Sequence, residues 1–443
     1  MPAAGAFRHR AQGPRPTRIT ANRVKILLLN QAFYPDSVST SQHVTDIARE
    51  LCSQGHEITV LCARRDYKEP RLVYPPFEIV DRIRVHRVGS TRFGKESLVT
   101  RILDAVTYDV LSLWRLLRLP RHDMVIAFTS PPLAGLHGAL GARLWRARFV
   151  HWLMNINHEM AMEIGYVRRK SLLGRVLTAI YRFTLRTCDW VVVMDRWMKS
   201  RVQREGVVGH QNIVIVPLWP ITPDEDDEIA APQGVNPFRD KYGLVGKFVV
   251  VHSGNLSYVH PLDTVLKAIV RLKDDPSIVF VFIGYGVREK DINEHVRRHG
   301  LANVLKLPYQ PRELLGKSLG MADLHLIVMG NAASGLLHSS KIYSILASGR
   351  PYLFVGPRDS HIVSDVLEPC AGGFHVENGD VDGFLEVIEK VKRLSIEERT
   401  AIHLRNRAFV ASQFNRRECL DHFTKHIIEA RQDSIRTTQA PRL

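Results

Sequence analysis

The sequence of 443 residues is poor in cysteine. Its five cysteines are scattered and show no C-x-x-C spacing: Cys52, Cys62, Cys188, Cys370 and Cys419. An odd, scattered set in a chain of this length argues against a disulfide framework and predicts reduced thiols in the cytosol.

Secretory signals and membrane spans are also missing. Residues 1–22 are rich in Arg, Pro and Ala without an acidic residue, which predicts a disordered basic tail. Residues 124–142 are uncharged but contain two prolines and three glycines, so a strand, a turn and a small-residue helix fit them better than a span. Residues 98–119 are apolar but interrupted by charges, which is typical of an amphipathic helix that can lie against a bilayer.

Three common catalytic fingerprints fail. No G-x-x-x-x-G-K-[ST] loop is present, and Gly284-x-Gly286 is followed by Glu289 where the dinucleotide motif needs a third glycine. His158-Glu159 begins like H-E-x-x-H, but Met162 ends the match. A kinase, a dehydrogenase and a metallohydrolase are therefore disfavoured, and we expect neither a metal nor another cofactor.

The positive charge lies entirely in the first half. Up to residue 220 there are 33 Lys and Arg against 17 Asp and Glu, and beyond it 28 of each, for a net charge of +16. This asymmetry favours a phosphate-bearing partner, either an anionic membrane surface or nucleic acid, unless the charge is only a solvated face. We expect no nucleic acid, because aromatic and basic residues do not interleave. Candidate membrane contacts are Arg115, Arg118, Arg121, Arg143, Arg146, Arg148, Arg168, Arg169 and Lys170.

Hydrophobic runs alternate with helical patterns in two blocks, which predicts an α/β protein with two Rossmann-like domains facing a central cleft. We place the first domain at residues 23–220, a proline-rich acidic linker at 221–240, the second domain at 241–412 and a final helical segment at 413–435. The expected strands span residues 24–30, 58–62, 84–88, 123–128, 149–154 and 190–194, then 248–252, 278–283, 304–307, 324–328 and 352–355.

Polar residues gather in the loops that follow several of these strands, where ligands of such folds bind. In the first domain they are Ser39, Thr40 and Ser41, which can receive a phosphate or merely cap a helix, and Asn155, Asn157, His158 and Glu159. In the second domain they are Gly254, Asn255 and His260, and Ser339, Ser340 and Lys341. A lysine in the first turn of the expected helix 341–347 opposes the helix dipole, which makes sense if an anion such as a diphosphate binds there.

The order and spacing of these stretches resemble glycosyltransferase family 4 of the GT-B fold, and within it bacterial exopolysaccharide and lipopolysaccharide glycosyltransferases of the colanic-acid type. The resemblance covers about residues 24–415. The stretches that carry it include FYPDSVSTSQHVTDIARELCSQGHEITVLCARRDY, HWLMNINHEMAMEIGY, FVVVHSGNLSYVHPLDTVLKAI, LPYQPRELLGKSLGMADLHLIVMG and HSSKIYSILASGRPYLFVGPRDSHI.

The resemblance implies a metal-independent, retaining transfer of a sugar from a nucleotide diphosphate sugar to an acceptor hydroxyl, with the donor in the second domain and the acceptor in the first. The acceptor would be a glycan or a lipid-linked intermediate, and the enzyme would be cytoplasmic or peripheral on the inner face of the membrane. Donor-binding residues would be Gly254, Asn255, His260, Tyr309, Gln310, Ser339, Ser340, Lys341 and Ser344. Ser39, Thr40, Ser41 and Asn157 would meet the sugar or acceptor, and Lys341, Asn155, His158 and Glu159 would serve catalysis.

The chain also departs from the family pattern. Leu336 and Ser344 occupy the positions of a common Glu-x7-Glu pair, and Asn155 stands where relatives carry an aspartate. Because asparagine is no general base, a protein that has lost catalysis and only binds nucleotide sugars stays open as an alternative. An epimerase or phosphorylase of the same two-domain architecture is a second alternative, and the positive charge leaves a nucleic-acid-binding protein as a third.

Overall fold

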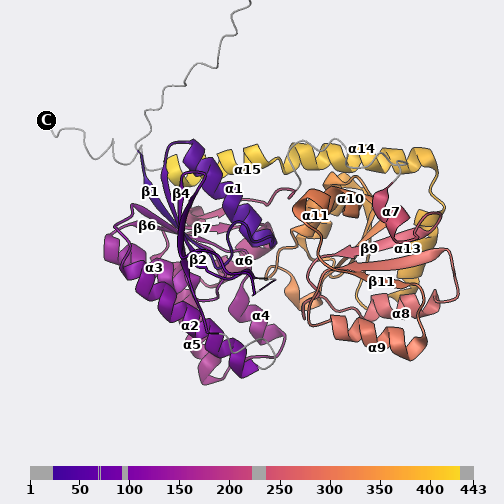
Figure 1. The fold of residues 1–443 in the computed structure, drawn as a ribbon, viewed down its shortest axis with the longest axis horizontal. Coiled ribbons are helices and arrows are strands. Elements are labelled where there is room, and N and C mark those ends of the chain that lie inside the picture. Colours follow the sequence, from indigo (N-terminus) through magenta and orange to yellow (C-terminus); the bar gives the residue numbers. More distant parts are fainter. Residues whose placement is uncertain (1–22, 68, 70, 92–97, 222–235, 430–443) are drawn as a thin grey trace, which may run out of the picture.

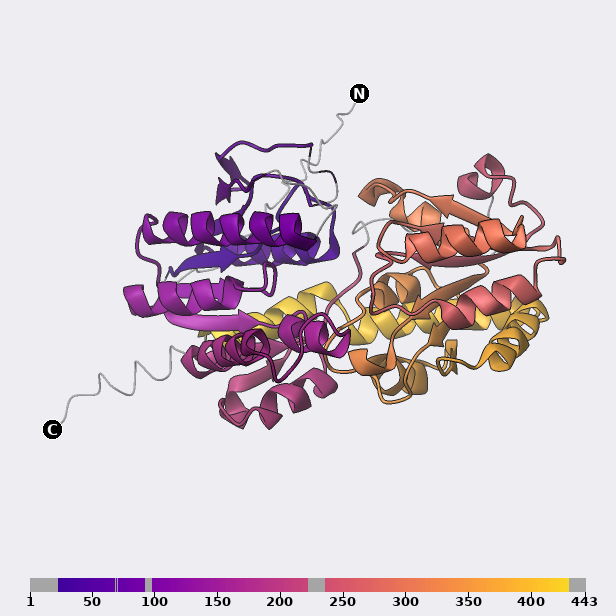
Figure 2. The same cartoon turned by 90° about the horizontal axis from the view of Figure 1, so that it is seen from below.

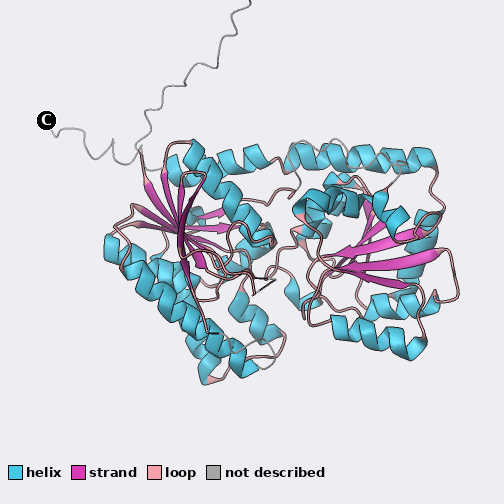
Figure 3. Ribbon diagram, in the orientation of Figure 1, coloured by secondary structure: helices cyan, strands magenta, loops and turns pink. Residues whose placement is uncertain are grey.

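The structure is a computed structural model that describes residues 23–67, 69, 71–91, 98–221 and 236–429. It consists of two α/β domains side by side, each built on a sheet with helices on both faces (Figures 1 and 3). The expected fold class is therefore confirmed. The basic tail, most of the linker and the last residues of the expected final segment lie outside the described residues.

The first domain contains an eight-stranded sheet in the order β3-β4-β2-β1-β5-β6-β7-β8. All its neighbouring strands run parallel except the antiparallel pair β3 and β4. The central strands are continuous apolar runs because both faces of a parallel sheet are covered by helices. The strands are β1 (Lys25–Leu29), β2 (Glu57–Ala63), β3 (Phe77–Val80), β4 (Ile83–Val88), β5 (Met124–Ala127), β6 (Arg148–Trp152), β7 (Trp190–Val193) and β8 (Ile213–Ile215).

Helices α2, α3 and α5 lie next to one another on the outer side of this domain, in the order α2, α3, α5 (Figures 1 and 2). A Cβ on Gly138 of α3 would stand only 2.5 Å from the Phe149 ring, so a glycine is needed for α3 to approach the sheet. The prediction of a strand, a turn and a small-residue helix at residues 124–142 is confirmed. The helices are α1 (Ser39–Ser53), α2 (Leu98–Leu117), α3 (Ala134–Trp145), α4 (Asn157–Glu163), α5 (Leu172–Thr187) and α6 (Arg196–Arg204).

The second domain has a six-stranded parallel sheet in the order β11-β10-β9-β12-β13-β14. Its strands are β9 (Phe248–Ser253), β10 (Ile278–Ile283), β11 (Val304–Leu307), β12 (Leu324–Val328), β13 (Tyr352–Val355) and β14 (Gly373–Val376). Its helices are α7 (Pro237–Lys241), α8 (Asp263–Arg271), α9 (Glu289–His299), α10 (Leu315–Gly320), α11 (Lys341–Ala347), α12 (Glu368–Cys370) and α13 (Val381–Lys392).

The end of the chain returns to the first domain. Helix α14 (Ile396–Gln413) runs along the second domain, and α15 (Arg416–Phe423) continues over the first, as the yellow ribbon of Figure 1 shows. The Phe423 ring lies 4.9 Å from that of Trp152 in β6, and Arg416 pairs with Asp46 of α1 at 3.4 Å. One apolar cluster extends from the first sheet through α15 to α11, so the two domains share part of their core.

Replacing Phe423 by Ala is expected to lower the free energy of unfolding by about 3–5 kcal/mol, since the ring is fully buried at the junction of α15 and the first sheet. Denaturant unfolding followed by tryptophan fluorescence measures the loss. Leu404→Ala on α14, whose side chain is 63% exposed, is the matched control and should change stability by less than about 0.5 kcal/mol. Equal effects of the two substitutions would contradict the packing described for α15.

Candidate functional site

Loops from the two domains meet where their strands end. The Oγ atoms of Ser39, at the start of α1, and Ser340, directly before α11, lie 2.9 Å apart. Helix α1 begins at Ser39, its N-cap is Val38, and no side chain caps it. The hydroxyl of Ser39 thus reaches across to the second domain instead of closing its own helix.

Lys341 is the first residue of α11, and its side chain turns inward to the end of β9. Its Nζ lies 3.5 Å from Nε2 of His252, whose Nδ1–H donates to the Leu326 carbonyl at 3.1 Å. The Nε2 lone pair of His252 therefore faces the ammonium. Burial lowers the pKa of Lys341 to about 8 because a charge is costly away from water. Lys341 is partly exposed as a residue, but its ammonium turns toward the end of β9 and not out to solvent.

Glycines let the backbone pack closely around this lysine. Gly254 has a φ of 135°, and a Cβ there would lie 3.1 Å from Lys341 Nζ. Gly284, with a φ of 125°, packs so closely that its Cβ would be 2.4 Å from the Gly254 carbonyl oxygen. Both positions suit only glycine, because other residues rarely adopt such angles. The two turns can therefore pack this closely against each other and against the ammonium only because both positions are glycine.

His260 stabilises the β9–α8 loop instead of presenting a second cation. Its Nδ1 accepts a hydrogen bond from the Ser257 amide at 3.3 Å and lies 2.9 Å from Ser257 Oγ. Burial holds the pKa of His260 well below its ordinary value, and the charge of Lys341 lowers it further. The neutral ring also bonds to the backbone of Asn255. Lys341 is therefore the charged group of this loop cluster.

Tyr309 and Gln310 follow β11 next to the Gly284 turn. The Tyr309 ring packs edge-on against Tyr285 with centroids 5.8 Å apart, and burial raises the pKa of Tyr309 to about 12. Gln310 is partly exposed and donates to the Pro308 carbonyl at 2.7 Å. An aromatic face beside the turn fits the predicted contact with a nucleobase, which stays a prediction.

The polar segment after β6 is used mainly for structure. Asn155 forms an isolated antiparallel bridge with Leu337 of the second domain, and the Asn157 amide donates to the Thr129 carbonyl at 2.7 Å. The His158 ring packs 4.2 Å from that of Tyr181, where burial lowers its pKa to about 4. Glu159 is held by Arg201 at 3.0 Å. The geometry gives neither His158 nor Glu159 the free position that a general base or nucleophile needs.

The remaining predicted residues are hydrogen-bonded within the protein, partly exposed, or buried inside a helix. The Ser339 amide donates to Nε2 of His361 at 3.3 Å, so it already has a partner. Ser344 accepts from the Ile221 amide at 3.3 Å, which ties α11 to the segment leaving the first domain. Thr40 is partly exposed, whereas Ser41 is fully buried within α1. Among the predicted residues, Ser39 contacts Ser340, and Gly254 lies beside Lys341. Within the described part of the chain, Ser41 makes no hydrogen bond to the second domain.

A buried group that the sequence did not single out joins the domains beside this cluster. Asp195, between β7 and α6, accepts from Nδ1 of His338 at 2.7 Å, and the His338 ring stacks on that of His361 with centroids 4.0 Å apart. Burial raises the pKa of Asp195, but the hydrogen bond from His338, the electrostatic effect of the two histidine rings and the Met198 amide outweigh it and lower the pKa to about 2. An aspartate placed after a predicted strand was the available signal, but its partners lie 143 residues away or more.

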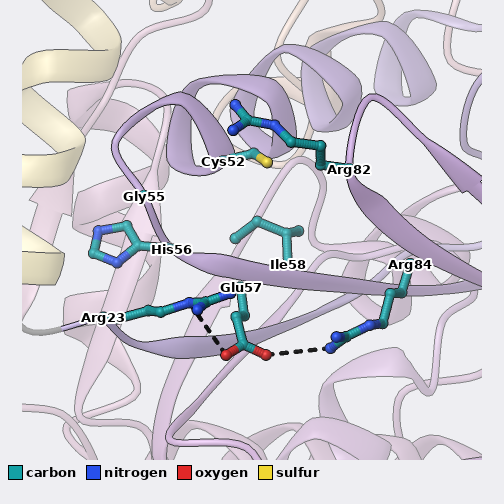
Figure 4. Close-up of a pocket in the computed structure, with 8 residues that line it drawn as sticks. All are labelled: Arg23, Cys52, Gly55, His56, Glu57, Ile58, Arg82 and Arg84. Carbon is teal, nitrogen blue, oxygen red and sulfur yellow. Dashed lines mark hydrogen bonds and ion pairs between the residues drawn. The ribbon is translucent and has the colours of Figure 1, made fainter.

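The protein has hollows at two places that bear on the location of a ligand site. One of about 160 Å³ lies between the domains and is lined mostly by apolar groups, among them Met160, Ile164, Tyr258 and Leu336. The other, of about 130 Å³, lies at the amino ends of β2 and β4, where Arg23 and Arg84 bind Glu57 (Figure 4). Ligands of parallel sheets bind at the carboxyl ends, so only the hollow between the domains adjoins the candidate site.

Comparison with known proteins agrees with this geometry. The description "Glycosyl transferase 4-like domain" matches residues 40–219, and "Glycosyl transferases group 1" matches residues 236–408. The two-domain architecture with parallel sheets is that of a GT-B glycosyltransferase. The chain belongs to glycosyltransferase family 4, as its resemblance predicted, and such enzymes use nucleotide sugars.

Two curated bacterial proteins are similar over most of their length. The putative colanic acid biosynthesis glycosyl transferase WcaI of Escherichia coli (strain K12) is 24% identical over 348 residues, 74% of this chain and 82% of that protein. The probable glycosyltransferase WbjE of Pseudomonas aeruginosa is 24% identical over 281 residues, 63% of this chain and 68% of that protein.

Solved structures share the fold. Anabaena HepE in complex with UDP-glucose superimposes with a TM-score of 0.67 at 15% identity, covering 92% of this chain and all of that one. WaaG, a glycosyltransferase involved in lipopolysaccharide biosynthesis, gives 0.67 at 15% identity and covers 90% and 99%.

Affinity for a nucleoside diphosphate is expected to fall about tenfold between pH 7 and pH 9. The pKa of Lys341 is about 8 in the free protein, so the ammonium is mostly lost by pH 9 while the phosphates stay ionised. Calorimetric titrations across this range measure the effect. Lys341→Met should bind weakly at every pH, and an equally steep profile in that variant would assign the titration to another group.

Proposed function

We propose that the chain is a retaining glycosyltransferase that moves a sugar from a nucleotide diphosphate sugar to a hydroxyl of a glycan or lipid-linked intermediate. The observation that carries this proposal is the inward-facing Lys341 beside Gly254, at the start of a helix that touches the first domain through Ser340 and Ser39. Its ammonium would bind the leaving diphosphate and stabilise the charge that develops there. The binding of UDP-glucose by HepE and the assignment of WcaI to colanic acid biosynthesis support the donor class and the acceptor class.

The chemical step would need no enzyme carboxylate. The acceptor oxygen forms a bond to the anomeric carbon while the bond from that carbon to the β-phosphate oxygen breaks. The acceptor's proton passes to the departing phosphate, so atoms and charge balance. Glu159, the carboxylate that the sequence offered as a nucleophile, is buried against Arg201, which favours this direct route over a covalent intermediate.

Transfer from a labelled nucleotide sugar to a lipid-linked or polysaccharide acceptor tests the proposal, with NMR of the product giving its anomeric configuration. Lys341→Ala is expected to lower kcat/KM by on the order of 10²–10³-fold, since one stabilising donor at the leaving group is lost. Lys317→Ala, an exposed lysine of α10, should leave the rate unchanged. Sugar isomerisation without an acceptor would identify an epimerase, and binding without turnover would identify a protein that has lost catalysis.

We further propose that the first domain contacts anionic lipid at the inner face of the membrane. Helix α2 bears an exposed apolar stripe at helical spacing, formed by Leu103, Val106, Val110, Trp114 and Leu117. The exposed Arg118 lies 3.5 Å over the Trp114 ring of this stripe. No helix among the described residues is long and apolar enough to span a bilayer. An apolar face with a basic rim suits the surface of an anionic membrane, where each basic residue contributes roughly 1 kcal/mol.

Sedimentation with vesicles containing phosphatidylglycerol at low salt measures this contact. The wild type is expected to sediment with these vesicles and to remain in solution with neutral phosphatidylcholine vesicles. The triple variant Val110→Gln, Trp114→Gln and Leu117→Gln should lose the binding. Leu404→Gln on α14 removes a similarly exposed leucine from the other domain and should bind as wild type. A wild type that stays in solution with both lipids would refute the docking face.

A further inference from the structure

Asp195, His338 and His361 form a buried connection between the domains that the proposed chemistry does not use. Asp195 Oδ1 accepts from the Met198 amide at 2.7 Å and so caps helix α6 of the first domain. Its Oδ2 accepts from Nδ1 of His338 at 2.7 Å and lies 3.8 Å from Nδ1 of His361. These three side chains are at most 3% exposed. A carboxylate so deeply buried is stable only with strong partners, and both histidines come from the second domain.

The second nitrogen of each ring leads to the segment that carries Lys341. His338 Nε2 lies 2.7 Å from the Tyr343 hydroxyl, on α11. His361 Nε2 accepts from the Ser339 amide at 3.3 Å. One carboxylate of the first domain is therefore connected through two rings to two points, one before and one after Lys341.

A metal ion is the competing interpretation, because the three residues offer ligand atoms within 4.8 Å of one another. The two imidazoles, however, are stacked 4.0 Å apart at 20° between their planes. Ring nitrogens in parallel stacked rings point alongside one another and do not converge on one ion. Asp195 Oδ2 and His338 Nδ1 also lie 2.7 Å apart, which is a hydrogen-bond distance, whereas two ligand atoms of a tetrahedral zinc ion stand about 3.3 Å from each other.

We propose that Asp195 is a positioning residue that sets the donor-binding geometry of Lys341 through His338 and His361. Donor binding is then coupled to the association of the domains, because separating them removes Asp195 from both rings and releases residues 339–343. This inference rests on the proposed function, since it assumes that Lys341 binds the donor diphosphate. Asp195 itself makes no contact with the donor in this account.

Asp195→Asn is the sharpest variant. Its amide oxygen can still cap α6, but its NH2 group would face Nδ1 of His338, which now donates. The ring must change tautomer or turn, and its bond to Tyr343 changes with it. The dissociation constant for a nucleoside diphosphate should rise about tenfold, equivalent to about 1.4 kcal/mol. In steady state the donor KM should rise while the acceptor KM stays unchanged.

Calorimetry with uridine diphosphate and guanosine diphosphate, each alone, compares wild type, Asp195→Asn, Tyr343→Phe and the double variant. We call the connection from Asp195 through His338 to Tyr343 the relay. It predicts non-additive losses of binding free energy in the double variant, because both substitutions interrupt the same connection. Asp365→Asn is the matched control: Asp365 pairs with Arg196 at 3.2 Å across the same interface but is partly exposed. It should bind the diphosphates as wild type does. Thermal unfolding of each variant identifies any that fails to fold, and Tyr343→Phe alone then tests the relay.

The outcomes separate the two proposals. A wild type that binds no nucleoside diphosphate overturns the proposed function and this inference with it. A wild type that binds, together with an Asp195→Asn variant of equal affinity, overturns only the relay. Additive losses would show that Asp195 merely joins the domains, which also contradicts its role in positioning Lys341.

Discussion

A lysine ammonium held partly away from water is the constraint on which the candidate site depends. Burial disfavours the charge of Lys341 and lowers its pKa to about 8, while the neutral ring of His252 gives it a single weak contact at 3.5 Å. An anion at this point would restore the interactions that the charge has lost. Among the described residues of the candidate site, the charge of Lys341 therefore has no anionic partner of its own, as expected of a lysine that binds a phosphate.

The rest of the structure positions this cation. The parallel sheets bring the β1–α1 and β9–α8 loops to the same region, and Ser39 joins Ser340 across the two domains. Helix α15 buries Phe423 against the first sheet, so the chain end holds the domains together on the side shown at the top of Figure 1. In our proposal Asp195 adds a polar contact between the domains near the lysine, so that the association of the domains and the position of residues 339–343 depend on each other.

The sequence predicted most of the buried elements because parallel strands are unbroken apolar runs. The run expected at residues 24–30 is β1 (Lys25–Leu29), and the expected helix at 341–347 has the bounds of α11. Of the edge strands, β11 was predicted, but β3, β8 and β14 were missed. Strand β3 (Phe77–Val80) follows two prolines and is partly exposed, so it lacks such a run. Lys341 was recognised because its position opposes the helix dipole. Asp195, His338 and His361 were not, because their relation exists only after the domains pack and leaves no local spacing in the chain.

A crystal structure of the protein with a nucleoside diphosphate bound would test directly whether Lys341 binds the phosphates. We expect a phosphate oxygen within hydrogen-bonding distance of Lys341 Nζ, beside the Gly254 turn. A diphosphate bound instead among the arginines at the amino ends of β2 and β4, with Lys341 still in contact with His252 alone, would contradict it.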